Sequence, residues 1–347
     1  MHDVLLLLKD LMSIPSTTGR EEEIGKFLAA ILKSMDMDVY TQEVEKGRFN
    51  VIGKRGNHGV LIVTHMDTVP ADEDTDKLYL QKSGMLRGRG VIDTKGLIAA
   101  LLSALSRTKD PVTVAFVVDE EETGLGSRVL EVPPSNYTLV LEPTDLKIAT
   151  IEAGFLEVVV TFYGKSAHGA HPEKGNNALE RLYNFLQSVE NLSFIKPQHP
   201  LFYPPLYLLQ EIKGGSVIYR VPDKAILRLN FILQPGISPV EALEELSQYI
   251  DEDTEIEVVD MDEAIVIDED EDVVIRLGEA YKRATGEEPS YTVMRSWTDA
   301  ANLYMKGLKP VIFGAGSLWK AHTSEESVTL KELAALRDIL IEFIEGE

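Results

Sequence analysis

The stretch Val60–Pro70, VLIVTHMDTVP, decides how the rest of this chain is interpreted. Its apolar beginning predicts a short buried strand, and a polar turn that carries His65 and Asp67 follows at once. In an open α/β sheet, ligands bind beyond the carboxyl ends of the strands, so both side chains are well placed for chemistry. The His-x-Asp spacing is typical of a metal-binding histidine whose second ring nitrogen is held by a carboxylate.

Strands and helices alternate on both sides of this stretch. Buried strands are expected at Val112–Val118, Tyr137–Leu141 and Pro310–Phe313, and helices at Lys95–Ser106 and Leu330–Ile344. Continuous apolar strands of this kind are typical of sheets covered on both faces. The pattern predicts an α/β domain with a mixed, mainly parallel sheet flanked by helices.

The middle of the chain has a different pattern. Leu156–Tyr163 and Ala225–Leu233 alternate apolar and polar residues with the period of half-exposed strands. Because the α/β pattern returns afterwards, the simplest arrangement is an α+β module inserted into the first domain. We therefore expect a catalytic domain at 1–153 and 263–347, and an inserted domain at 154–262.

The composition excludes several classes of protein. The chain has no cysteine, so disulfides and thiolate chemistry are excluded. A net charge of −23 argues against binding to nucleic acid or to an anionic membrane surface. No apolar run approaches the roughly 18 residues of a membrane span. The N-terminal leucine run is interrupted by Lys9 and Asp10 and lacks the features of a signal peptide, so we expect a cytoplasmic protein.

Acidic residues or histidines follow several of the expected strands. Each one alone has an ordinary explanation as a surface or hydrogen-bonded residue. Together they would collect charge at one edge of the sheet, which is costly unless a cation neutralises it. The candidates are His65, Asp93, Glu120 or Glu121, Glu142 and His322. Nitrogen and oxygen ligands without cysteine fit zinc or cobalt(II) better than a soft metal.

Six motifs occur in the order and spacing of a known family: THMDTVP, GRGVIDTKG, DEEETG, EPT, GKSAHGAHPEKGNNAL and AHTSEE. The sequence resembles the di-zinc aminoacylase and carboxypeptidase family. That family includes acetylornithine deacetylase, succinyl-diaminopimelate desuccinylase and the hydrolases that free lysine or ornithine from an amino-group carrier protein. The resemblance covers nearly the whole chain. It implies a hydrolase of linear amide bonds that uses two zinc or cobalt ions per subunit.

The resemblance also implies a role for each candidate residue. The implied ligands are His65 and Glu142 for one metal, Glu121 and His322 for the other, and Asp93 as the bridge between them. Asp67 would orient the ring of His65, and Glu120 would be the general base. Because DEEETG contains three successive glutamates, the alignment of this motif with the family can shift by one residue, and Glu122 is then the alternative to the assignment of Glu120 and Glu121. A cis peptide is implied after the bridging acid.

In the resembled family the inserted module is a lid and dimerisation domain. The histidine that matches His168 reaches into the partner subunit's active site, so we expect a homodimer. His171 has no such counterpart, and we expect it to be structural. Arg295 is the first candidate for binding a substrate carboxylate, and Arg220 is the second, because a guanidinium matches a planar carboxylate.

The leading hypothesis is the removal of an acyl group from an N-acyl amino acid during amino-acid biosynthesis. Acetylornithine, acetyl-lysine, and lysine or ornithine linked to a carrier protein are the expected substrates. The alternative is a carboxypeptidase or dipeptidase of the same family. A catalytically dead relative that serves as a binding dimer is the rival from a different class. Such a relative would be expected to lose ligands or the base, and none is missing here.

Overall fold

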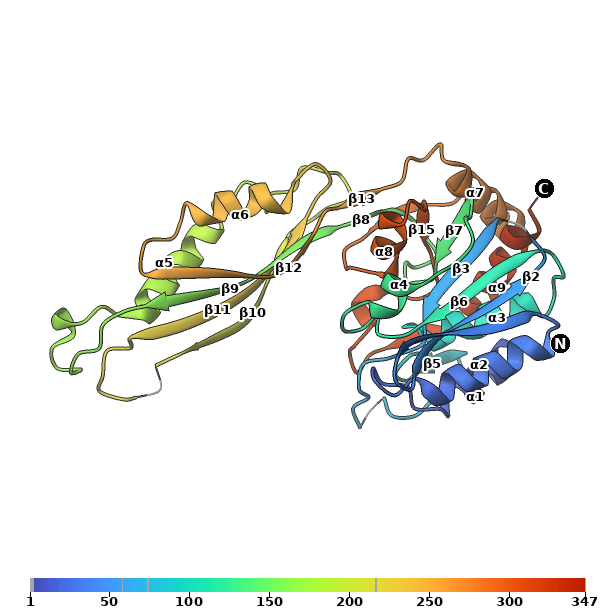
Figure 1. Cartoon of the computed structure of the whole chain (residues 1–347), viewed down its shortest axis with the longest axis horizontal. Helices are drawn as coiled ribbons and strands as arrows, with labels where there is room; N and C mark the ends of the chain where they lie inside the picture. The colour runs from blue at the N-terminus through green and yellow to red at the C-terminus, as the bar shows by residue number, and fades with distance from the viewer. Residues whose placement is uncertain (1–2, 58, 74, 216, 347) are drawn as a thin grey trace. The chain divides into compact units, whose positions relative to one another are not determined.

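The computed structural model describes residues 3–57, 59–73, 75–215 and 217–346, which form two compact units (Figure 1). The first unit reaches to Thr150 and resumes over Ile267–Met294 and from Thr298 onward. The second unit consists of Ile151–Val266 together with Arg295–Trp297.

A mixed sheet forms the centre of the first unit. Its strands lie in the order β1 (Asp38–Glu45), β2 (Arg48–Arg55), β6 (Val112–Val117), β3 (Val60–His65), β7 (Tyr137–Val140), β15 (Pro310–Ile312) and β8 (Ile148–Glu152), and β14 (Tyr291–Met294) also pairs with β8. The neighbours β6, β3, β7 and β15 run parallel to one another. Every residue of β3 and β6 is buried, which explains their continuous apolar sequences.

Helices cover this sheet. They are α1 (Val4–Met12), α2 (Glu22–Ser34), α3 (Lys95–Leu105), α4 (Leu125–Val129), α7 (Asp272–Thr285), α8 (Asp299–Met305) and α9 (Leu330–Glu345). Helix α3 is buried along its whole length and packs against α1 and α9. A small sheet of β4 (Tyr79–Leu80), β5 (Met85–Arg87) and β16 (Ser327–Thr329) joins the end of the chain to the loop before α3. Among the described helices, none is long and apolar enough to cross a membrane.

The second unit has an antiparallel sheet in the order β10 (Tyr207–Gly214), β11 (Lys224–Leu233), β9 (Gly154–Tyr163) and β12 (Thr254–Asp262). Alternate residues of β9 and β11 are buried. These side chains form one apolar core with α5 (Ala178–Val189) and α6 (Pro239–Ser247). The alternation predicted for these strands is therefore confirmed, because only one face of the sheet is covered by helices.

The topology of the first unit gathers side chains at one edge of its sheet. Strand β3 ends at His65, β6 runs into Asp119–Glu121, and β7 runs toward Glu142. Because the three strands are parallel neighbours, their carboxyl ends lie together. The expected fold class, a mixed and mainly parallel sheet flanked by helices, is confirmed.

Candidate metal centre

Asp93 lies between two histidines and presents one carboxylate oxygen to each. Its Oδ1 is 3.0 Å from Nε2 of His65, and its Oδ2 is 3.1 Å from Nε2 of His322. The first histidine also has Oε1 of Glu142 at 3.6 Å, and the second has Oε2 of Glu121 at 2.9 Å. Two groups that could each hold a metal ion result, His65–Asp93–Glu142 and Asp93–Glu121–His322. They share Asp93.

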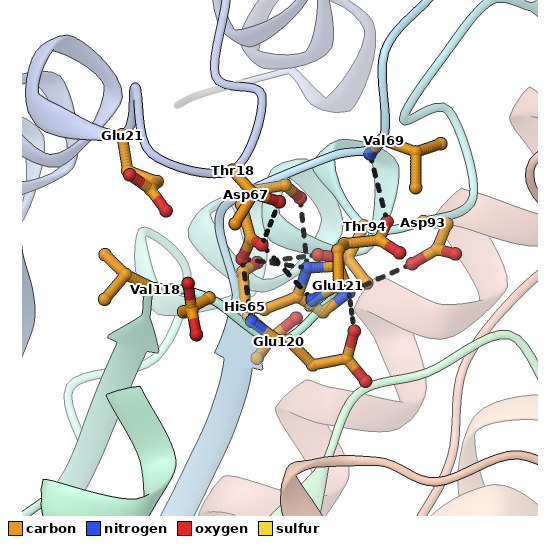
Figure 2. Close-up of polar contacts among 12 residues, drawn as sticks. Thr18, Glu21, His65, Asp67, Val69, Asp93, Thr94, Val118, Glu120 and Glu121 are labelled. Carbon is orange, nitrogen blue, oxygen red and sulfur yellow. Dashed lines mark hydrogen bonds and ion pairs between the residues drawn. The ribbon is translucent and has the colours of Figure 1, made fainter. Parts of the chain in front are cut away.

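These ligands come from distant parts of the chain. Asp93 lies on the glycine-rich loop before α3, and the Asp93–Thr94 peptide that follows it is cis. The Thr94 hydroxyl donates a 2.7 Å hydrogen bond to the carbonyl oxygen of His65, which fixes this loop to the end of β3. Figure 2 shows His65 with Asp93, Glu120 and Glu121 gathered beyond that strand.

Asp67 acts on two parts of the site at once (Figure 2). Its backbone carbonyl oxygen is 3.0 Å from Nδ1 of His65, whereas its carboxylate is 3.6 Å from that nitrogen. The carboxylate instead accepts hydrogen bonds from the backbone N–H groups of Glu120 and Glu121 and from the hydroxyl of Thr18. The carbonyl oxygen is thus the nearer partner of the ring, and the Asp67 carboxylate is the more distant one. With a proton on Nδ1, the lone pair of Nε2 points toward the carboxylates.

Burial gives the carboxylates of this site unusual proton affinities. For both Glu120 and Glu142, burial raises the pKa well above its ordinary value, and the nearby His65 opposes this only in part. Burial also raises the pKa of Asp93, but the hydrogen bonds from His322 and His65 outweigh it and hold the pKa below its ordinary value. The same contacts with Asp93 and Glu121 raise the pKa of His322 to about 10.

The residues present fit divalent metal ions. Oε1 of Glu142 is buried and has no hydrogen-bond partner in the described part of the chain. Neither histidine is a metal ligand while its Nε2 is protonated, and a cation would take the place of that proton between the ring and the carboxylates. The donor set is two imidazoles and three carboxylates, which suits zinc or cobalt(II).

Glu120 is the glutamate of its run that is best placed to act as a base. Its Oε2 lies 3.9 Å from Nε2 of His65, and its side chain is 11% exposed. Glu121 belongs to the group around His322, and Glu122 is exposed and belongs to neither group. The geometry therefore favours the register with Glu120 as base over the alternative with Glu122.

The three remaining candidates lie in the second unit. His168 is exposed, and its Nδ1 accepts a 3.1 Å hydrogen bond from the backbone N–H of Ala170. Arg220 is paired with Asp223 at 2.6 Å. The guanidinium of Arg295 lies 4.2 Å from the centre of the Tyr203 ring, and its Nη2 donates to a backbone carbonyl.

Several residues that support the site are not predicted by any pattern in the sequence. Thr18 donates to Asp67, and Arg48 lies between the buried carboxylates of Glu21 and Asp119, the residue before the candidate base. Asp299 is fully buried, and burial raises its pKa to about 7. No periodic pattern marks these residues, because each acts through contacts between distant segments.

Comparisons with known proteins agree with this geometry. The profile described as peptidase family M20/M25/M40 matches residues 61–346. The chain is 29% identical to a probable carboxypeptidase of Emericella nidulans, over 95% of this chain and 86% of that protein. It is 30% identical to an acetylornithine deacetylase of Myxococcus xanthus, over 84% of this chain and 82% of that one. A tripeptidase of Staphylococcus aureus, 20% identical, has the same fold with a TM-score of 0.86 over 99% of this chain and 97% of its own.

Proposed function

Because the chain belongs to peptidase family M20/M25/M40 and is therefore a hydrolase of amide bonds, we propose that it removes the acyl group from an N-acyl amino acid with two divalent metal ions. The observation that carries the two-metal proposal is the position of Asp93, whose two oxygens face two different histidines. The proposed ions are zinc or cobalt(II). His65 and Glu142 would hold one ion, Glu121 and His322 the other, and Asp93 both.

Glu120 is the proposed general base. Bound metal ions lower the pKa of a coordinated water and stabilise negative charge on the amide oxygen. Glu120 accepts the proton of the attacking water at its carboxylate and then delivers it to the nitrogen of the leaving amine. Asp67 assists because its carboxylate holds the backbone N–H groups of Glu120 and Glu121, which fixes the base relative to its neighbouring ligand.

We also propose that the second unit, over about residues 154–262, is a lid and dimerisation domain and that His168 completes the partner subunit's site. The bond that Nδ1 of His168 accepts leaves the ring proton on Nε2. An N–H group of this kind can stabilise the oxygen of an amide during hydrolysis. Substitution of His168 by alanine should lower kcat strongly and leave metal content unchanged. Activity regained in mixed dimers with Glu120→Ala would support the shared site, and no regained activity would reject it.

The substrate proposed first is an acetylated ornithine or lysine, and we propose a cytoplasmic enzyme of amino-acid biosynthesis. The identity to an acetylornithine deacetylase supports this proposal. Lysine or ornithine linked to a carrier protein is a further substrate of the same chemistry. Arg295 is the proposed contact for the substrate carboxylate, with Arg220 as the second candidate.

Carboxypeptidase or dipeptidase activity is the second candidate function, because a probable carboxypeptidase is also similar along nearly the whole chain. A hydrolysis screen separates the two. N-acetyl, N-succinyl and γ-glutamyl amino acids should be compared with dipeptides and with carrier-linked lysine, with and without added cobalt. We expect metal-dependent release of the free amino acid from the N-acyl substrates. Activity confined to dipeptides would overturn the deacylase proposal, and no hydrolysis either with or without added cobalt would favour a binding protein.

A further inference from the structure

A buried glutamate joins the two loops that carry metal ligands. Glu326 comes four residues after His322 in the sequence, and its side chain is 0% exposed. Its Oε2 pairs with the guanidinium of Arg89 at 2.6 Å. Its Oε1 accepts hydrogen bonds from the backbone N–H of Gly90 at 2.7 Å and of Ile92 at 3.3 Å. One carboxylate thus makes three contacts within the loop that leads into Asp93.

The loop around Gly90 is held by individual hydrogen bonds, which also include those from the backbone N–H of Arg89 to the carbonyl oxygen of Thr75 at 2.9 Å and from that of Gly88 to the carbonyl oxygen of Glu326 at 3.3 Å. Gly88 and Gly90 have φ angles of 151° and 90°, which are accessible mainly to glycine and lie outside regular structure. A segment without a helical or strand ladder relies on individual hydrogen bonds for its position. Of the Glu326 contacts, the bond to Ile92 reaches the residue directly before Asp93.

We propose that Glu326 is a positioning residue that sets the metal affinity of the Asp93–Glu121–His322 group. Asp93 comes from the loop that Glu326 holds, and His322 comes from the segment of Glu326 itself. Fixing one segment to the other fixes the two ligands relative to each other. Glu326 belongs to neither candidate ligand group, so it would act through Asp93 and His322. This inference rests on the proposed two-metal function.

The Glu326 carboxylate is not the only link between its own segment and the segment that leads into the Asp93 loop. Beyond Glu326, strand β16 pairs with β5, and the side chain of Arg87 donates a 2.9 Å hydrogen bond to the carbonyl oxygen of Ser324. These bonds remain when the Glu326 carboxylate is changed. The expected result is therefore a local loss of ligand position, not a loss of the fold. Changes to residues that orient metal ligands typically cost about 10–100-fold in metal affinity.

The test is a calorimetric titration of the metal-free protein with Co²⁺, for wild type and for Glu326→Gln. Glutamine keeps an acceptor for Gly90 but removes the charge that pairs with Arg89. We expect two equivalents in both proteins, with the one at the Asp93–Glu121–His322 group weakened about 10–100-fold in the variant and the other, which shares only Asp93 with it, weakened less. The matched control is Glu325→Gln, the exposed neighbour, which should bind as wild type does.

Further variants identify the affected site. In the background of His322→Ala, which weakens the same group, Glu326→Gln should cause a smaller loss at the remaining site than it causes at the Asp93–Glu121–His322 group of the wild type, because only Asp93 is shared. Arg89→Lys, which keeps the charge but not the shape of the guanidinium, should weaken the same equivalent by a smaller factor and serves if Glu326→Gln does not fold. Equal weakening of both equivalents, or wild-type binding in the variant, would overturn the inference. If wild type itself binds fewer than two equivalents, the proposed function fails instead.

Discussion

Arg48 should contribute strongly to stability, because it lies between two buried carboxylates. Its guanidinium is 2.5 Å from Oε1 of Glu21 and 2.6 Å from Oδ1 of Asp119, and the side chains of these acids are 1% and 4% exposed. Replacement by methionine keeps most of the side-chain volume and leaves both acids without their partner. Removing one partner of a buried ion pair typically costs about 3–5 kcal/mol. We expect Arg48→Met to lower the free energy of unfolding by about that amount.

Urea unfolding at neutral pH, followed by circular dichroism, measures this difference. The control is Lys282→Met, which removes an ion pair with Glu288 whose side chains are 59% and 73% exposed and should cost at most about 1 kcal/mol. The double variant Glu21→Gln, Arg48→Met should lose less than the sum of the two single variants, because the charges act as one unit. A loss below about 1 kcal/mol for Arg48→Met, or simple additivity, would refute this reasoning.

Two further predictions concern a glycine and an acid. Gly96→Ala should destabilise the protein by about 1–3 kcal/mol or more, because a Cβ there would lie 1.9 Å from the carbonyl oxygen of Val91. Gly278→Ala in α7 is the control: its Cβ would have its nearest neighbour at 3.7 Å, so the change should stabilise the protein by about 0.5–1 kcal/mol. Thermal unfolding of both variants checks this, and equal effects would contradict it. For Asp119, burial raises the pKa, but the hydrogen bond from Thr123 and the charge of Arg48 outweigh it and hold the pKa below 3.8. The contribution of the Asp119 carboxylate to the free energy of unfolding should be complete above pH 3.8 and should disappear as the pH falls through the lower pKa of the folded state. The difference in stability between wild type and Asp119→Asn should therefore shrink in acid, and a difference independent of pH would contradict this prediction.

The sequence predicts the central sheet well, and the candidate ligands it indicates lie together in the fold, for physical reasons. Strands such as β3 are continuous apolar runs because helices cover both faces, and parallel neighbours bring their ends together. The ligands His65 and Asp93 stand next to recognisable elements, so their placement follows from the order of strands and loops.

The contacts that support the ligands were not predictable in the same way. Arg48 and Asp119 are 71 positions apart, and Arg89 and Glu326 are 237 positions apart. Such pairs have no periodicity and no local spacing, because the folded chain alone brings them together. The hydrogen bonds that the Asp67 carboxylate accepts from backbone N–H groups were not predictable for the same reason. His-x-Asp spacing indicates a contact with the ring, but it does not reveal that backbone N–H groups from another strand end compete for that carboxylate.

The central claim is that two metal ions share Asp93 and that Glu120 moves the proton. Titration of the metal-free protein with Co²⁺, with kcat measured on the same samples, tests it most directly. Wild type and Glu120→Gln should each bind two equivalents per chain, while kcat falls by about 10²–10⁴-fold in the variant alone. Binding of a single equivalent by wild type, or an unchanged kcat in Glu120→Gln, would contradict the account.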